Sequence, residues 1–311
     1  MTSCGETIKP VSGFANANGI SIAYESFGAD NADAVVFIAG TGMQLTEWPD
    51  ELMEGLAQAG FRAIRYDNRD CGLSAKFSDA GVPDSEAITV ALQEGRPVPI
   101  PYTLTDMAED AVGLLDALNI QKAHFVGVSM GGAIAQLVAI NFPERVLSLC
   151  LIASDSGNRE IPVIAKPEAF AKVPPVPQAG DREGYIKYNI ETQKVLDSPG
   201  YPSCECEIAE RVRKSVERDY DPDALLRQQT AVFLDRFISS YRRDNLKNII
   251  APTAIIHGAD DVLVDTANAE DLASSIKNSQ LVIIPGMNHS ISKTLVPKLV
   301  EEIINNIHRV Y

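Results

Sequence analysis

Residues 126–132, with the sequence VGVSMGG, contain the side chain best suited to nucleophilic chemistry, the hydroxyl of Ser129. An apolar run over 123–128 predicts a short buried strand, and a second one over 132–140 predicts a buried helix. Between them, 127–131 has the pattern Gly-x-Ser-x-Gly, whose glycines leave room for a sharp strand-to-helix turn with a strained central residue. The turn presents Ser129 at a helix N-terminus, where free N–H groups favour negative charge. These features predict a nucleophile, although the pattern alone also suits a turn that only packs or that binds a phosphate.

A serine nucleophile needs a base, and the chain offers four histidines. His124 begins a predicted strand at the end far from Ser129, and His308 lies in the last helical turn, so we interpret both as structural. His257 ends a predicted strand close to the site. His289 lies in a loop after the last predicted strand, from which it can reach Ser129 across the edge of a sheet. We therefore predict that His289 is the base.

A carboxylate should orient that imidazole and stabilise its charged form. The candidates in the sequence are Asp155, Asp260, Asp261 and Asp265. The predicted strand that ends at residue 257 leads directly into Asp260 and Asp261, one strand away from the base. A solvated turn or a helix N-cap is the alternative for paired aspartates, and it suits one of the two. The residue pattern by itself leaves the choice between the two aspartates open.

Apolar segments alternate with helical patterns along most of the chain, which predicts an α/β fold with a mostly parallel sheet and helices on both faces. Catalytic groups in such sheets gather in loops at the carboxyl ends of the strands, where Ser129, Asp261 and His289 fall. The predicted strands are 11–17 and 20–27, which form a hairpin, followed by 34–39, 61–66, 123–128, 146–153, 252–258 and 280–284, and the predicted helices are 49–59, 103–118, 132–140, 267–275 and a closing amphipathic helix with Leu295, Leu299, Ile303 and Ile307 on one face.

Two segments interrupt this alternation. Residues 75–101 contain four prolines and predict a long loop that could narrow the entrance of a site. Residues 156–245 show no strand pattern, so we expect an all-helical insertion, with 1–155 and 246–311 forming the core. The aromatic residues of the insertion are expected either to form its own core or, in part, to line an apolar pocket: Phe170, Tyr185, Tyr188, Phe233, Phe237 and Tyr241.

The composition disfavours several classes of function. The formal net charge is −15, from 42 acidic against 27 basic residues, so we expect no nucleic-acid or membrane partner. No apolar run is long enough to span a membrane, and residues 1–10 lack the apolar core of a secretory signal. The five cysteines form a sparse, odd set, which favours reduced thiols and a cytoplasmic protein. Cys204 and Cys206 have neither redox nor zinc-site spacing, and we interpret the pair as incidental.

The sequence resembles the α/β-hydrolase superfamily. Its nucleophile pattern and the chain order Ser129, Asp261, His289 are those of that superfamily. Within it, the sequence is similar to the branch that contains the aclacinomycin methylesterases and related carboxylesterases. The motifs that carry this resemblance are RYDNRDCGLS at 65–74, AHFVGVSMG at 123–131, PTAIIHG at 252–258 and GMNH at 286–289. The resemblance extends from about residue 19 to the end and is weak through the insertion, whose position matches the cap of those enzymes.

The resemblance implies a role for each matching position. Ser129 would be the nucleophile, His289 the base and Asp261 the acid, and the backbone N–H groups of Met130 and Thr41 would form the oxyanion hole. No metal or organic cofactor is implied.

The sequence departs from the family pattern at three loops, in one of which Val262 and Asp265 replace prolines often seen after the acid. Residues 39–42, AGTG, stand where many members have His-Gly, and Asn288 replaces a frequent glycine before the base. Asp67 and Arg69 match a structural turn of the family and are not expected to be catalytic.

The activity that this resemblance implies is serine-dependent hydrolysis of neutral, small-to-medium carboxylic esters, methyl esters included, through an acyl-enzyme. Lactone hydrolysis, C–C bond hydrolysis and cofactor-free perhydrolysis use the same three residues. A small-molecule receptor with slow or no turnover is the alternative from another class. The expected partner is a small-molecule ester, and the sequence leaves open whether the protein is a monomer or a homodimer.

Overall fold

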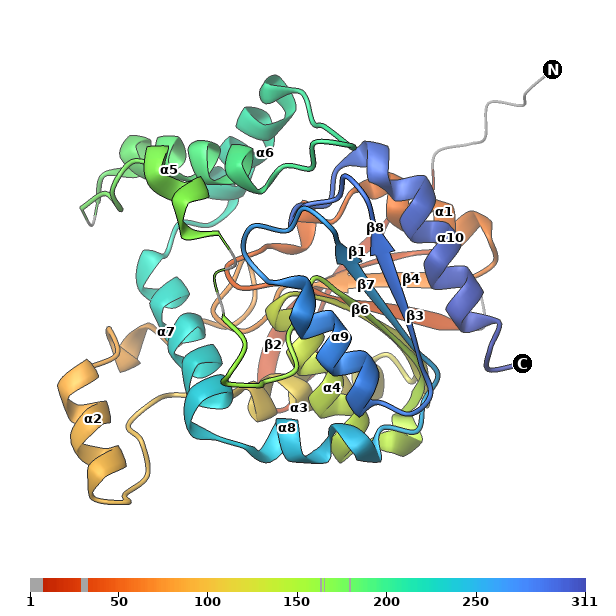
Figure 1. Ribbon diagram of the computed structural model, residues 1–311, viewed down its shortest axis with the longest axis horizontal. Helices are drawn as coiled ribbons and strands as arrows, with labels where there is room; N and C mark the ends of the chain where they lie inside the picture. The colour runs from red at the N-terminus through yellow and green to blue at the C-terminus, as the bar shows by residue number, and fades with distance from the viewer. Residues whose placement is uncertain (1–7, 29–32, 163, 165, 179) are drawn as a thin grey trace.

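The computed structural model describes residues 8–28, 33–162, 164, 166–178 and 180–311 (Figure 1). The expectation that residues 1–10 lack a secretory signal concerns a segment that lies mostly outside the described residues. Cys4 also lies outside them.

An eight-stranded sheet with the order β1-β2-β4-β3-β5-β6-β7-β8 forms the centre of the molecule (Figure 1). β1 and β2, and β2 and β4, pair antiparallel, whereas all other neighbours pair parallel. The predicted mostly parallel sheet is therefore confirmed. The strands are β1 (Val11–Ala17), β2 (Ile20–Phe27), β3 (Ala34–Ile38), β4 (Arg62–Tyr66), β5 (Ala123–Val128), β6 (Val146–Ile152), β7 (Thr253–Gly258) and β8 (Ser279–Ile284).

The predicted hairpin forms because its turn residues tolerate left-handed backbone angles. Asn18 and Gly19 have φ values of 49° and 77°, and two consecutive positive φ values match the twist of the flanking strands. The central strands β3 and β5 are buried along their whole length, as their continuous apolar runs predict.

Helices cover both faces of the sheet, as predicted. α1 (Asp50–Gln58) and α10 (Val296–Ile307) pack on one face, whereas α3 (Leu104–Ala117), α4 (Met130–Asn141) and α9 (Thr266–Ser275) pack on the other. The predicted apolar face of the closing helix is buried in the first of these layers. The short helices are η1 (Leu45–Glu47), η2 (Ser78–Ala80), η3 (Pro143–Arg145), η4 (Pro167–Lys172), η6 (Leu246–Asn248) and η7 (Lys293–Leu295).

The predicted loop over 75–101 is wrong in part, because it contains helix α2 (Ser85–Gln93). The Asp84 side chain caps this helix by accepting hydrogen bonds from the N–H groups of Glu86 and Ala87. The prolines flank the helix instead of interrupting it, since Pro83 precedes the cap and the others follow residue 96.

The segment between β6 and β7 is helical, as predicted for residues 156–245, which we call the insertion. It contains α5 (Arg182–Leu196), α6 (Glu205–Arg218), α7 (Pro222–Phe233), the π-helix η5 (Leu234–Ile238) and α8 (Tyr241–Asn245). Figure 1 shows α5 and α6 at the top left, beyond the carboxyl ends of the parallel strands, and α7 descending along the side of the molecule.

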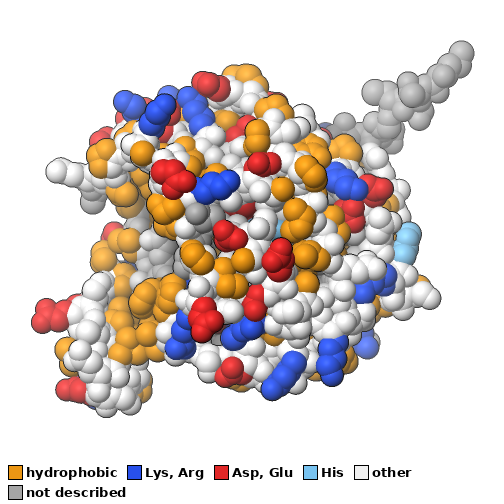
Figure 2. Space-filling model, viewed as in Figure 1, with side chains coloured by type: hydrophobic (Ala, Val, Ile, Leu, Met, Phe, Trp, Pro, Cys, Tyr) orange, Lys and Arg blue, Asp and Glu red, His pale blue; other side chains and the backbone are white. Residues whose placement is uncertain are grey.

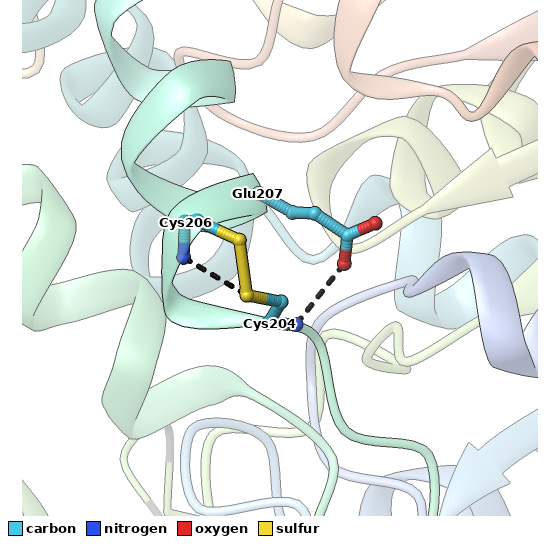
Figure 3. Close-up of a disulfide and its surroundings, with 3 residues drawn as sticks. All are labelled: Cys204, Cys206 and Glu207. Carbon is cyan, nitrogen blue, oxygen red and sulfur yellow. Dashed lines mark hydrogen bonds between the residues drawn. A yellow bond between two sulfur atoms is a disulfide. The ribbon is translucent and has the colours of Figure 1, made fainter.

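The expectation that all cysteines are reduced is wrong at one pair. Cys204 and Cys206 form a disulfide at the N-terminus of α6 (Figure 3). The turn that begins the helix brings their Cα atoms to 5.2 Å, a separation that suits a disulfide, although the two residues are only two positions apart. Glu207 accepts a hydrogen bond from the N–H of Cys204 and closes the same turn. Cys71 and Cys150 are buried free thiols, and burial raises the pKa of each.

Figure 2 shows acidic and basic side chains intermixed on the face that it draws. Across the part of the chain that the structure describes, no helix is both long and apolar enough to cross a membrane.

Candidate active site

Ser129 occupies a strained turn between β5 and α4. Its φ and ψ angles are 53° and −121°. L-residues rarely adopt this combination, and residues with such strained backbone angles cluster at functional sites. The pattern glycines are required by close backbone contacts: a Cβ on residue 127 would lie 2.2 Å from the carbonyl oxygen of Gly131, and one on residue 131 would lie 2.0 Å from that of Ile38. The turn leaves Ser129 partly exposed at the start of α4.

The parallel strands bring the other candidate residues to the same edge of the sheet. Asp261 follows β7 and His289 follows β8, and the His289 Nδ1 lies 2.9 Å from Asp261 Oδ2. Hydrogen bonding at Nδ1 leaves Nε2 free to receive a proton. His289 and Ser129 line the same cavity, and within the described chain no hydrogen bond joins the Ser129 hydroxyl to the imidazole.

Asp261 is held as a buried carboxylate. Its Oδ1 accepts hydrogen bonds from the N–H groups of Leu263 and Val264, at 2.8 Å and 2.9 Å. Burial raises the pKa of this carboxyl, but the neighbouring His289 and the hydrogen bonds outweigh burial and hold the pKa below its ordinary value. Asp261 therefore presents a negative charge to the imidazole.

The other candidate acids have different contacts. Asp260 Oδ2 accepts a hydrogen bond from the Gly286 N–H, and Asp265 caps α9. Asp155 follows β6 and pairs with Arg236 and Arg242 instead of with a histidine.

The remaining histidines lie in structural surroundings. Buried His124 lies 2.8 Å from the Ser148 hydroxyl, and burial lowers its pKa to about 4. His257 is buried with Nε2 2.8 Å from the Val264 carbonyl oxygen, and burial lowers its pKa as well. His308 ends α10.

Two backbone N–H groups beside Ser129 are available to a ligand. Among the described residues, nothing accepts a hydrogen bond from the N–H of Met130 or from that of Thr41, the two groups that the resemblance singles out. The loop that contains Thr41 is fixed from two sides. The Gly42 N–H donates to Gln228 of α7 at 2.8 Å, and the Asn68 amide donates to the Ala39 carbonyl at 3.0 Å.

A cavity of about 400 Å³ connects these groups and has mainly aliphatic walls. No described Phe, Tyr or Trp lines it, so of the two alternatives for the aromatic residues of the insertion, the one in which some of them line this cavity does not hold. Tyr185 packs against Tyr220, and Phe233 is about half exposed. The aliphatic lining comes from the core and from the insertion: Met43, Leu104, Val128, Met130, Ala133, Ile164, Leu196, Val232, Leu263, Val264 and Ile291. No described residue of 75–101 lines this cavity.

An ion-pair cluster that the sequence did not predict lines part of the same cavity. Arg236 and Arg242, each 2% exposed, pair with Asp155 at 2.7 Å and 3.1 Å, and Arg242 also pairs with Asp235 at 2.8 Å. Burial raises the pKa of Asp155, but the two arginines outweigh it and lower the pKa. With two positive and two negative groups, the cluster adds no net charge to the cavity.

A second feature that the sequence did not predict is the side chain of Asn288, which is buried between His289 and the insertion. No local pattern marks Asn288 or the arginines, because the partners that join them to other elements lie far away in the chain: Val195 and Asp197 for Asn288, and Asp155 for the arginines. The described residues contain no group of three or more side chains that could hold a metal ion.

Known proteins share this architecture. A profile of the α/β hydrolase fold matches residues 33–294. The chain is 28% identical over 287 residues to rhodomycin D methylesterase DauP of Streptomyces sp. (strain C5), a match that covers 84% of this chain and 87% of that protein. It is 26% identical over 287 residues to rhodomycin D methylesterase DnrP of Streptomyces peucetius, with the same coverage of 84% and 87%. The solved structure of the meta-cleavage product hydrolase CumD from Pseudomonas fluorescens IP01 aligns with a TM-score of 0.70 at 18% identity, over 99% of this chain and 100% of that one.

Proposed function

Because the chain belongs to the α/β-hydrolase fold family, we propose that it is a serine carboxylesterase that hydrolyses neutral, small-to-medium esters through an acyl-enzyme. One observation carries this proposal: the strained Ser129 shares a cavity with His289, whose imidazole is hydrogen-bonded to the buried carboxylate of Asp261. Similarity to two methylesterases supports an ester as the substrate, and methyl esters belong to the proposed class.

In the proposed reaction, Ser129 Oγ attacks the ester carbonyl while His289 Nε2 takes its proton. The negative charge on the tetrahedral oxygen is stabilised by the N–H groups of Met130 and Thr41. His289 then gives the proton to the departing alcohol, and the acyl group remains on Ser129. Water, deprotonated by His289, releases the acid and restores the serine. The hydrogen bond between Ser129 and the imidazole forms when substrate closes the site.

The insertion serves as a cap in this proposal, over a core of residues 1–155 and 246–311. Leu196 and Val232 of the insertion line the cavity, so the cap forms one wall of the substrate site. The partner is a small-molecule ester, and the net charge of −15 disfavours nucleic acid and anionic membranes as partners. We propose a cytoplasmic location on the sparse cysteine content, with Cys71 and Cys150 as free thiols beside the Cys204–Cys206 disulfide.

Turnover of p-nitrophenyl acetate and butyrate tests the proposal. We expect the wild type to hydrolyse both, and the Ser129→Ala variant to remain folded with at least roughly a thousandfold lower kcat, because the three residues act as a unit. A fluorophosphonate should label Ser129 in the wild type alone. A wild type that binds esters without turnover would favour the receptor alternative. An active Ser129→Ala variant, or labelling of another residue, would overturn the assignment of the nucleophile.

A further inference from the structure

The residue before His289 has an unusually complete set of contacts. Asn288 is 4% exposed, and its side-chain oxygen accepts hydrogen bonds from the N–H groups of Val262 and His289, at 3.0 Å and 2.9 Å. Its side-chain nitrogen donates to the carbonyl oxygens of Val195 and Asp197, at 2.9 Å and 3.1 Å. An amide side chain has two donor hydrogens and two acceptor lone pairs, so all four are used.

The acceptor half of this side chain binds both catalytic loops at once. Val262 directly follows Asp261, and His289 is the proposed base, so a single oxygen atom holds the backbone beside each partner of the 2.9 Å hydrogen bond between Asp261 and His289. Fixing both backbones restricts the distance and the angle between carboxylate and imidazole.

The donor half binds the end of helix α5 in the insertion. The last carbonyl groups of a helix have no partner within the helix, and the Asn288 amide supplies one for Val195 and one for Asp197, which follows the helix. Two further bonds join the same segments: the Asn288 N–H donates to the Ser198 hydroxyl at 2.9 Å, and the Ser290 N–H donates to the Leu196 carbonyl at 3.0 Å.

We propose that Asn288 is a positioning residue that fixes His289 against Asp261 and couples both of them to helix α5 of the insertion. This proposal rests on the function proposed above. Asparagine fits this position better than aspartate, glycine or alanine. An aspartate would turn a carboxylate oxygen toward two carbonyl oxygens, and a glycine or an alanine would leave two N–H groups and two carbonyl groups without their partner.

The test compares Asn288→Ala and Asn288→Asp with Asn306→Ala. Asn306 is a matched control because it is similarly buried, at 2% exposure, and its amide donates to the carbonyl of Leu149, in the middle of β6 and not among the residues that line the cavity. We expect both Asn288 variants to lose roughly 10- to 100-fold in kcat, with KM changed by less than about threefold, because small displacements of a catalytic group cost rate more than binding. Asn306→Ala should lower Tm and leave kcat within about twofold.

A second measurement does not depend on turnover. The proton that joins Asp261 and His289 should give a low-field NMR signal in the wild type, assigned by its loss in Asp261→Asn. We expect this signal to disappear or to move upfield in Asn288→Ala and to persist in Asn306→Ala. The NMR signal also tests the positioning role of Asn288 separately from the esterase function. A wild type without esterase activity would count against the esterase, but the NMR signals of the wild type and the variants could still be compared. Asn288→Ala with an unchanged signal, or with kcat within twofold of the wild type, would overturn the positioning role.

Discussion

Asp260 and Asp261 are adjacent and chemically identical, yet their contacts differ. Asp261 Oδ2 faces the His289 imidazole at 2.9 Å, whereas Asp260 Oδ2 accepts a backbone N–H from Gly286. At position 260, a neutral amide could replace the carboxylate, because the amide oxygen still accepts the hydrogen bond from Gly286. At position 261, an amide could not replace the carboxylate, because it would lack the negative charge that stabilises the imidazolium and would favour the wrong tautomer of His289.

We therefore expect Asp261→Asn to lower kcat roughly 10³- to 10⁴-fold, and Asp260→Asn to have a much smaller effect. Kinetics on p-nitrophenyl butyrate, with circular dichroism to verify folding, measures both. Activity losses in the reverse order would move the acid role to Asp260 and leave the nucleophile unchanged.

The positions of Ser129, Asp261 and His289 after strands could be predicted because short local patterns specify each loop and the parallel sheet aligns them. Asn288 was noticed only as a departure from a family pattern. Its contacts with Val195 and Asp197 lie more than ninety residues away, at 93 and 91 positions, and no local pattern records them.

At the scale of elements, ion pairs bind the insertion to the core. Arg236 of η5 and Arg242 of α8 converge on Asp155, which follows β6. Breaking a buried pair by removing one partner leaves an uncompensated charge, which costs more than the pair itself contributes.

We expect Asp155→Asn to lower the free energy of unfolding by about 3 kcal/mol at pH 7, measured by urea denaturation. The folded-state pKa of Asp155 is depressed by Arg242 and Arg236 against burial, so its stabilisation is complete above the unfolded pKa of about 3.9. This contribution disappears as pH falls through the folded-state pKa, and the two proteins should converge in acid. Glu94→Gln is the control, because the exposed pair of Glu94 with Arg96 should contribute less than about 1 kcal/mol. Equal effects of the two variants at pH 7 would contradict this prediction.

The elements themselves differ in how much could be predicted. The alternation of apolar runs and helical patterns determines the sheet, and a capping box of Thr103 and Asp106 begins α3 within the predicted helix 103–118. Helix α2 was missed because its prolines were interpreted as interrupting, although they flank it. The sequence left open which aromatic residues of the insertion line a pocket, because packing partners such as Tyr220 decide which side chains face inward.

For the whole molecule, charge and cavity together support the substrate class proposed above. A net charge of −15 disfavours the approach of anionic molecules, and the buried ion-pair cluster adds no net charge within the cavity. The cavity of about 400 Å³ has aliphatic walls, which suit an uncharged acyl or alkyl group of limited size.

We expect kcat/KM for p-nitrophenyl esters to peak at short to medium acyl chains and to fall toward palmitate, because a long chain exceeds a cavity bounded by Leu196 and Val232. Val232→Phe should shift the optimum to shorter chains by filling the insertion side of the cavity. Val90→Phe is the matched control, since Val90 lies on α2 and is 38% exposed outside the cavity. Highest efficiency on palmitate, or activation at a lipid–water interface, would identify a lipase groove instead. A chain-length optimum that moves equally in both variants would show that Val232 does not bound the acyl site.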